Sequence, residues 1–389
     1  MKVSIITSNR ADFGLLKNLI IKLKKNKSFH ISVIASGSHF LKKFGNTKNE
    51  IEKSGVKINE KIVCNFNSNN LTGISKIISK SVIKSSQIFK KLKPNLLIVL
   101  GDRYEILASV ISAHLSRIPI AHIHGGEVTH GALDDAYRHS ITKMSHIHFV
   151  ANEVYKKRVI QLGENPKYVY NIGGLGIDSI HNTKLIKKKV LEKKFNIKLQ
   201  KYNFLVTFHP ESLNKNKTKN QIKILLSALK SFKKTTFFFT APGADLENNE
   251  IIGELKKFIK SNKNAYFFKS LGHINYFSFL NFVDGMIGNS SSGILEMPYF
   301  KKGTVNIGNR QTGRLCAKSV VNTKINKLKI QEAIKKIISN NFLKNIKSFK
   351  NNMYGKPGAT DKIIKILKKI DYKDVYKSNF FDIKFRDKI

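Results

Sequence analysis

The 389-residue sequence contains only two cysteines, Cys64 and Cys316, and they lie far apart. So few cysteines exclude a disulfide framework and a cysteine-rich metal site, and they fit a reducing compartment. Long apolar runs are also missing, since none approaches the roughly 20 residues that a membrane span needs. The first apolar run ends before Asn9, too soon for a signal-peptide core. We therefore expect a cytoplasmic protein with no membrane association.

Acidic residues are scarce, because 26 Asp and Glu stand against 70 Lys and Arg, a formal net charge of +44. Such a charge raises the possibility of a nucleic-acid-binding module, a different class of function. Arginine is scarce too: only eight of the basic residues are arginine, and lysines occur along the whole chain. A nucleic-acid binder more often concentrates arginine and aromatic residues on one face. We expect a solvated lysine surface and no nucleic-acid partner.

Short apolar runs alternate with helix-length segments throughout the sequence. Runs without polar alternation are typical of parallel strands buried on both faces, and repeated strand–helix units predict doubly wound sheets. The predicted strands are 3–7, 31–35, 96–100, 118–123, 204–208, 236–240, 266–268, 285–287 and 304–307. The predicted helices are 12–25, 71–92, one after Asp102, 134–144, 221–232, 250–260, 274–282, one that opens at Ser291, and 360–370.

This pattern predicts an α/β protein of two Rossmann-like, doubly wound domains facing a cleft. A glycine-rich segment at 171–176 interrupts the alternation and is expected to be a hinge. The expected domains are residues 1–172 at the N-terminus, carrying acid–base chemistry, and residues 173–355, binding a nucleotide. Residues 356–389 are expected to form a last helix and tail that pack back on the N-terminal domain.

The segment 119–148 reverses the composition of the rest of the chain, because it holds six histidines, three acids and one arginine just after a predicted strand. The carboxyl edge of a strand is where an α/β enzyme places acid–base chemistry. The segment 101–105 ends a neighbouring strand, and clustered carboxylates can divide into base and acid. The candidates for one acid–base pocket are Asp102, His124, Glu127, Asp134, Asp135 and Arg138.

A metal site is the rival interpretation of these histidines. His122 and His124 alternate along a strand and therefore point to opposite faces, which weakens joint ligation of a metal. His139 lies near Asp135 on the predicted helix and is as suited to orienting that carboxylate as to binding metal. We therefore expect no metal.

Four other segments suit an anionic ligand. Arg10 lies beside a predicted helix N-terminus, and an ordinary helix cap formed by Asn9 or Asp12 is the alternative interpretation of that segment. The segment 288–293 offers hydroxyl and backbone donors, and two arginines in 309–314 suit a diphosphate. His209 ends a strand of the second domain, where it is expected to face the cleft. The candidate binding residues are Arg10, His209, Ser290, Ser291, Ser292, Gly293, Glu296, Arg310 and Arg314, and His209 is also a candidate for catalysis.

Taken together, these segments resemble the bacterial hydrolysing branch of the UDP-N-acetylglucosamine 2-epimerases, which makes N-acetylmannosamine for sialic acid. The resemblance covers nearly the whole chain and includes the closing motif at 379–383. The matching segments, in order, are NRADFG, GDRYE, HIHGGE, DDAYRHSITKMSH, HPESL, GNSSSGILE, NIGNRQTGR and NFFDI.

The resemblance implies a GT-B-type fold with a sugar nucleotide in the cleft. It assigns acid–base catalysis to Asp102, the HGGE segment and Asp134. One departure matters, because part of the family has glutamate where this chain has His124, so that role passes to His124 or to nearby Glu127. The positions that hold the nucleotide diphosphate in the family are matched by Arg10, His209, Ser290, Ser291, Glu296 and Arg310.

The expected reaction converts UDP-N-acetylglucosamine and water to N-acetylmannosamine and UDP. In the family chemistry, UDP leaves C1 while a base takes the C2 proton, giving 2-acetamidoglucal, which water then hydrates. No cofactor is expected, and the assembly is expected to be a homodimer or homotetramer. The alternatives are the same reaction on a UDP- or GDP-linked 2,4-diacetamido-6-deoxy sugar of the legionaminic acid pathway, or a GT-B glycosyltransferase.

Overall fold

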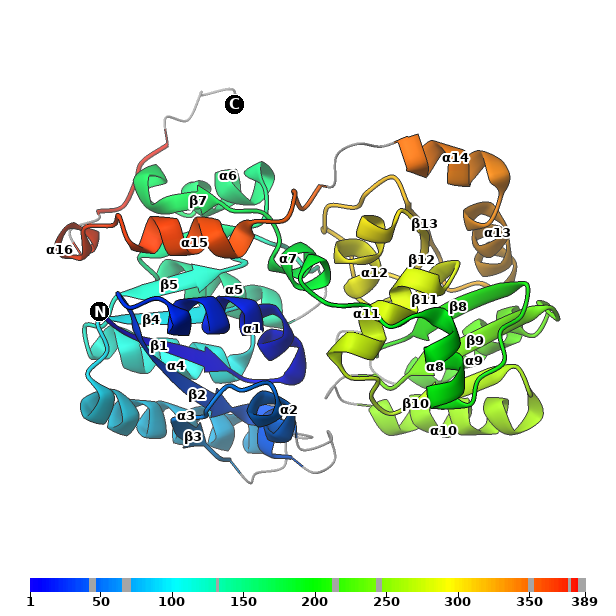
Figure 1. Cartoon of the computed structure of the whole chain (residues 1–389), viewed down its shortest axis with the longest axis horizontal. Helices are drawn as coiled ribbons and strands as arrows, with labels where there is room; N and C mark the ends of the chain where they lie inside the picture. Colours follow the sequence, from blue (N-terminus) through cyan, green and yellow to red (C-terminus); the bar gives the residue numbers. More distant parts are fainter. Residues whose placement is uncertain are drawn as a thin grey trace. The chain divides into compact units, whose positions relative to one another are not determined.

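The computed structural model describes residues 1–41, 47–64, 71–130, 133–211, 217–242, 247–348, 353–376 and 379–383. Ser212 and Leu213 of the HPESL segment lie outside these residues. The chain divides into two compact units. Unit 1 comprises Met1–Glu127, Leu133–Ser179 and Tyr354–Ile389, and unit 2 comprises Val128–Ala132 and Ile180–Met353. Each unit contains one parallel sheet with helices on both faces (Figure 1).

Unit 1 is built on a seven-stranded sheet with the strand order β3-β2-β1-β4-β5-β6-β7, in which each recorded pairing is parallel. The central strand β4, with the sequence LLIVL, is wholly apolar and is buried along its length. The strands are β1 (Lys2–Thr7), β2 (His30–Ser36), β3 (Glu60–Ile62), β4 (Leu96–Leu100), β5 (Ile120–Ile123), β6 (Ile147–Val150) and β7 (Val169–Asn171).

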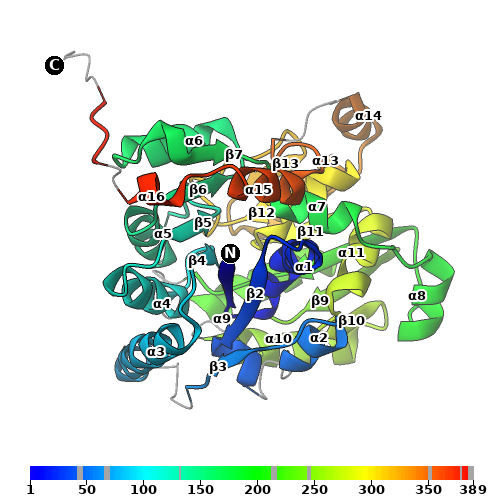
Figure 2. The ribbon, with the colours of Figure 1, turned by 60° about the vertical axis from the view of Figure 1, so that its left-hand side comes forward.

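The helices of unit 1 cover the two faces of this sheet. Apolar side chains of α1 and α15 pack on one face, and those of α3, α4 and α5 pack on the other, where the three helices lie side by side (Figure 2). The helices are α1 (Arg10–Lys25), α2 (Lys48–Lys53), α3 (Leu71–Leu92), α4 (Tyr104–Leu115), α5 (Asp134–Lys143), α6 (Glu153–Gln161), α7 (Leu175–His181), α15 (Ala359–Leu367) and α16 (Tyr372–Val375), with 3-10 turns η1 (Gly37–Phe40) and η3 (Pro166–Tyr168).

Unit 2 repeats this plan on a six-stranded parallel sheet with the order β10-β9-β8-β11-β12-β13. Helices α9, α10, α13 and α14 cover one face, and α8 and α11 cover the other. The strands are β8 (Tyr202–Thr207), β9 (Thr235–Thr240), β10 (Ala265–Phe268), β11 (Gly285–Gly288), β12 (Gly303–Ile307) and β13 (Val320–Thr323). The helices are α8 (Lys188–Phe195), α9 (Thr218–Leu229), α10 (Asn248–Ser261), α11 (His273–Phe282), α12 (Ser292–Leu295), α13 (Lys327–Ile337) and α14 (Asn340–Ser348), with the 3-10 turn η4 (Met297–Phe300).

Each sheet has a point at which the strand order reverses, between β1 and β4 in unit 1 and between β8 and β11 in unit 2. In parallel α/β sheets, ligands bind outside the carboxyl ends of the strands at such a point. Asn9 and Gly101 follow β1 and β4, while Phe208 and Asn289 follow β8 and β11. The candidate segments therefore lie at the carboxyl edge of each sheet.

The predicted α/β class with two parallel sheets is confirmed. Four strands were not predicted from the sequence. They are β3, β6, β7 and β13, each of three or four residues. A further difference concerns the helix predicted to open at Ser291 and to carry Glu296. Helix α12 has four residues, and Glu296 is its C-cap rather than part of it.

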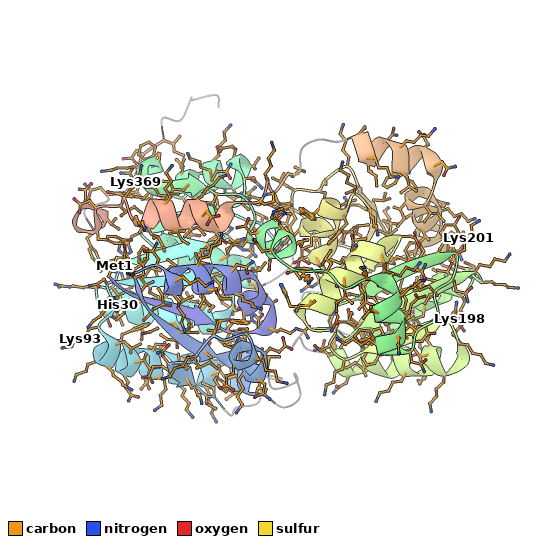
Figure 3. The ribbon with its side chains drawn as sticks, in the orientation of Figure 1. Met1, His30, Lys93, Lys198, Lys201 and Lys369 are labelled. Atoms are coloured by element: carbon orange, nitrogen blue, oxygen red, sulfur yellow. The ribbon has the colours of Figure 1, made fainter. Side chains whose placement is uncertain are left out.

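Lysine side chains cover the surface of both units. Lys93, Lys198, Lys201 and Lys369 point outwards into solvent (Figure 3). Within the described ranges, none of the helices combines the length and the apolar character that crossing a bilayer demands.

Candidate functional site

The acid–base candidates of unit 1 gather around one buried guanidinium. Arg138 lies on α5 with 2% of its surface exposed. Its Nη2 donates to Asp102 Oδ2, and its Nη1 donates to Asp135 Oδ1 at 2.8 Å and to the Glu127 carbonyl at 2.9 Å. The segment after β4, the turn after β5 and the first turn of α5 therefore converge on one side chain, and its contacts with the two carboxylates are charge-assisted hydrogen bonds.

The carboxylates keep Arg138 charged. Burial by itself lowers the pKa of the guanidinium, but nearby Asp102, Glu127 and Asp135 outweigh burial and raise it above its usual value. A permanently charged arginine can hold two carboxylates in place without exchanging protons with them. Asp134, the first residue of α5, is half-buried beside this cluster in the chain.

His124 and Glu127 form a close pair directly after β5. His124 Nδ1 lies 2.8 Å from Glu127 Oε1, and both side chains are buried. His139, by contrast, has its Nε2 3.6 Å from Asp135 Oδ2, an ion-pair separation rather than a hydrogen bond.

His122 lies two residues before His124 and contacts the segments that carry this cluster. The sequence analysis did not select it as a site residue. Its ring is fully buried, with Nε2 2.8 Å from the Gly101 carbonyl and Nδ1 3.1 Å from Thr142 Oγ1. A Cβ on Gly125 would lie 3.1 Å from His122 Nδ1, so the Gly-Gly turn packs tightly on this ring. Burial lowers the pKa of His122 to about 3, so the ring is neutral and acts as a structural link between β4 and α5.

The first turn of α1 provides the remaining unit 1 candidate. The side chain of Asn9 caps the helix by accepting from the Asp12 backbone N–H at 3.0 Å, so the simple capping interpretation is confirmed. Arg10 is exposed at the first position of α1. Asp12 is buried and accepts from Ser8 Oγ at 2.6 Å. Burial raises the pKa of Asp12 to about 6 although the Ser8 hydrogen bond and nearby Arg103 act in the opposite direction.

The binding candidates of unit 2 converge on Asn289, which is fully buried after β11. Its Oδ1 accepts from the His209 backbone N–H at 2.7 Å, and its Nδ2 donates to the His209 carbonyl at 2.8 Å. Its own carbonyl accepts from Gln311 Nε2 at 2.9 Å and from Arg310 Nη1 at 3.3 Å. Asn289 thus joins the loops after β8, β11 and β12. An asparagine immediately after a buried strand was a signal that the sequence analysis passed over.

The serine loop, residues 288–293, takes part in a second series of side-chain hydrogen bonds. Tyr276 Oη donates to Ser292 Oγ at 2.6 Å, and Ser292 Oγ donates to Glu296. Burial raises the pKa of Glu296 to about 7, against the lowering effect of the Ser292 hydrogen bond. Ser290 and Ser291 are half-buried in the same loop, while Gly293 packs so closely on Thr304 that a Cβ would approach its Cγ2 to 2.6 Å.

Arg314 belongs to a different part of unit 2. Its Nη2 donates to Thr129 Oγ1 at 3.4 Å, and the His130 backbone N–H donates to the Thr312 carbonyl at 3.0 Å. The chain that follows Glu127 is therefore attached to the arginine loop at 309–314. No group of three or more His, Cys, Asp and Glu side chains in the described part of the chain is arranged to hold a metal ion.

The family model for UDP-N-acetylglucosamine 2-epimerase matches residues 21–368. The chain belongs to this family. A relative from Campylobacter jejuni, GDP/UDP-N,N'-diacetylbacillosamine 2-epimerase (hydrolyzing), is 41% identical over 98% of this chain and 99% of its own length. Polysialic acid biosynthesis protein P7 of Escherichia coli is 37% identical over 96% of this chain and 97% of its own length.

Solved structures of this family have the same fold as this protein. The Neisseria meningitidis UDP-GlcNAc 2-epimerase, crystallised with UDP-GlcNAc, aligns with a TM-score of 0.80 at 17% identity. The alignment covers 95% of this chain and all of the Neisseria chain. At this identity the likeness concerns the fold alone, and it agrees with the two parallel sheets described above.

Proposed function

We propose that this protein is a hydrolysing 2-epimerase of a nucleoside-diphosphate-linked 2-acetamido sugar. The products are the free 2-epimeric sugar and the nucleoside diphosphate. The observation that carries the proposal is the convergence of Asp102, Glu127 and Asp135 on buried Arg138 at the carboxyl edge of the unit 1 sheet. Membership of the 2-epimerase family supports the same reaction class.

Unit 1 supplies the groups that move protons. The C2–H electron pair forms the C1=C2 double bond while the C1–O bond breaks, and the electrons of that bond leave with the diphosphate. Water then adds to C1 and a proton returns to C2 on the opposite face. The groups we assign to this acid–base work are Asp102, His124, Glu127, Asp134 and Asp135, with Arg138 holding the carboxylates. His209, which belongs to unit 2, is a further candidate.

Unit 2 supplies cations and N–H donors for the departing diphosphate, since stabilising developing charge is commonly the largest contribution to catalysis. Glu296 is suited to accept hydrogen bonds from ribose hydroxyls. The residues we assign to nucleotide and sugar binding are Arg10 of unit 1 and, from unit 2, His209, Ser290, Ser291, Ser292, Gly293, Glu296, Arg310 and Arg314. Neither a metal nor a cofactor enters this scheme, and assembly as a homodimer or homotetramer stays a prediction.

The relatives change the order of the two candidate sugars that the sequence analysis proposed. The printed name of the Campylobacter relative favours a UDP- or GDP-linked 2,4-diacetamido-6-deoxy sugar, and this is our first choice. UDP-N-acetylglucosamine is the second candidate, because the family model and the polysialic acid name of the E. coli relative favour it.

Product NMR in D₂O tests both the reaction and the substrate. We expect free sugar carrying deuterium at C2, together with nucleoside diphosphate, and faster turnover of the diacetamido sugar than of UDP-N-acetylglucosamine. Faster turnover of UDP-N-acetylglucosamine would reverse the order of the two substrates. Product without deuterium at C2 would contradict the elimination mechanism. Sugar release that depends on an added acceptor would instead indicate a glycosyltransferase.

A further inference from the structure

His124 combines three features that ordinary buried histidines do not share. The residue is 9% exposed, and its Nδ1 lies 2.8 Å from Glu127 Oε1. Its Nε2 is buried and has no hydrogen-bond partner in the described part of the chain. A buried polar atom without a partner costs about 1–3 kcal/mol. Such an atom in a native fold calls for an explanation, and a ligand group that arrives with the substrate is one.

The backbone holds the pair in this geometry. His124 adopts a φ of +67°, in the left-handed region that non-glycine residues rarely enter. Gly126 follows with a φ of +75°, and a Cβ there would approach the Tyr155 carbonyl to 2.5 Å. This tight turn brings residue 127 back beside residue 124. The Glu127 carbonyl is also held by Arg138 Nη1 at 2.9 Å.

The carboxylate decides which ring nitrogen carries the proton. An ionised carboxylate only accepts hydrogen bonds, so Nδ1 of His124 bears the hydrogen and Nε2 keeps its lone pair. When Nε2 takes up a proton, the imidazolium remains hydrogen-bonded to Glu127. Asp102 and Asp135, two of the other candidate bases, are each engaged by the guanidinium of Arg138.

Two other histidines, His139 and His148, also have a buried ring nitrogen without a hydrogen-bond partner in the described structure, but they lack the other features of His124. His139 has its nearest carboxylate oxygen at 3.6 Å. His148 lies within β6 at 1% exposure, and its partner Glu164 also binds Lys143 at 2.6 Å. Neither follows the carboxyl end of a strand as His124 does.

We propose that Nε2 of His124 removes the C2 proton in the elimination step, and that Glu127 is a positioning residue that fixes the tautomer and stabilises the imidazolium. This inference rests on the proposed function. In the step, the proton passes to Nε2, the C2–H electrons form the C1=C2 bond, and the C1–O electrons leave with the diphosphate. A histidine–glutamate pair thus performs the task that one glutamate performs in part of the family.

Separate assays of the two half-reactions test this assignment on the full-length protein. The elimination is followed as release of nucleoside diphosphate. The hydration is followed with the preformed glycal of the sugar that the wild type turns over, in the presence of the matching nucleoside diphosphate. We expect His124→Gln to slow elimination by about 10²–10⁴-fold, the usual contribution of one acid–base group. Hydration of the glycal should stay within a few-fold of wild type, because returning the proton from the opposite face does not use His124.

Glu127→Gln keeps an acceptor oxygen but removes the charge. We expect a smaller loss of kcat with little change in KM, and a shift of the acidic limb of the kcat/KM profile to lower pH. His114→Gln, at an exposed position of α4, is the matched control and should change neither step.

The outcomes separate the two proposals. Wild-type protein that releases no nucleoside diphosphate from any of the sugars overturns the proposed function itself. Active wild type beside His124→Gln with normal elimination overturns only the histidine assignment. An equal loss of elimination and hydration in a folded His124→Gln variant also overturns it, because that pattern indicates a purely structural role.

Discussion

At the scale of single residues, burial is the largest influence on the pKa values of Asp12, Glu296 and His122. Asp12 and Glu296 both have a raised pKa, about 6 and about 7, because burial penalises the carboxylate. His122 has a pKa lowered to about 3 because burial penalises the imidazolium. The local sequence around these residues does not indicate the pKa shifts, because the shifts depend on how deeply each side chain is buried in the folded protein.

Asp12 should make the protein less stable as the pH rises. Its folded pKa of about 6 exceeds the ordinary value of 3.8, so its contribution to stability is present below about pH 4 and is lost as the pH rises through 6. The loss should amount to about 2–3 kcal/mol at pH 8. We expect Asp12→Asn to remove this part of the decline in melting temperature between pH 4 and 8.

Thermal unfolding of wild type and Asp12→Asn across this pH range measures the effect. Glu52→Gln changes an exposed carboxylate of α2 and serves as the control, with no expected change in the pH slope. Equal slopes for wild type and Asp12→Asn would refute the prediction.

At the scale of elements, the loops after β8, β11 and β12 act as one platform because Asn289 joins them. Replacing Asn289 with alanine removes both side-chain hydrogen bonds and leaves the backbone groups of His209 without their partner. We expect UDP affinity to fall by about 10–100-fold, since each buried hydrogen-bonding group left unpaired costs about 1–3 kcal/mol. Isothermal titration calorimetry with UDP measures the loss.

Asn203 offers a matched control in the same sheet. It is also buried, and its Nδ2 donates to the Gln200 carbonyl at 3.0 Å, but it lies at the amino end of β8. Asn203→Ala should lower the melting temperature without changing UDP affinity. A comparable loss of affinity in both variants would show that general destabilisation, rather than the platform, is responsible.

Element boundaries show where local sequence is informative. Long apolar strands such as β4 were predicted because their burial on both faces leaves an unbroken apolar run. The short strands β3, β7 and β13 lie at sheet edges and exist through pairing with a neighbour, which local sequence does not encode. Helix α12 stops before Glu296 because Pro298 cannot continue it, and that signal was present in the sequence.

At the scale of the whole molecule, the end of the chain is anchored in unit 1. Asp178 is buried, and its carboxylate accepts from the backbone N–H groups of Gly358, Ala359 and Thr360, the last at 2.6 Å. It therefore caps α15 from a segment about 180 residues away. The helix buries Ile363 and Leu367 in the same core as α1.

Removing the Asp178 cap should lower the free energy of unfolding more than removing an exposed ion pair on the same helix. We expect Asp178→Ala to lower the free energy of unfolding by about 2–3 kcal/mol, combining a lost cap with unpaired N–H groups. Asp361→Asn breaks the exposed pair with Lys22 and should cost less than about 1 kcal/mol. Denaturant unfolding measures both, and hydrogen exchange in α15 should rise only for Asp178→Ala. Similar costs for the two variants would contradict the capping role.

The sequence by itself determined the alternation of strands and helices and the composition of each strand-end segment, because apolar periodicity and turn residues are local properties. It also carried the family resemblance. Tertiary structure alone decided that Arg138 meets Asp102 and that Asn289 joins three loops. It also decided that His124 pairs with Glu127 while its buried Nε2 has no hydrogen-bond partner among the described residues. These contacts depend on strand order, on backbone turns such as the left-handed His124, and on burial, all of which arise only when distant segments pack.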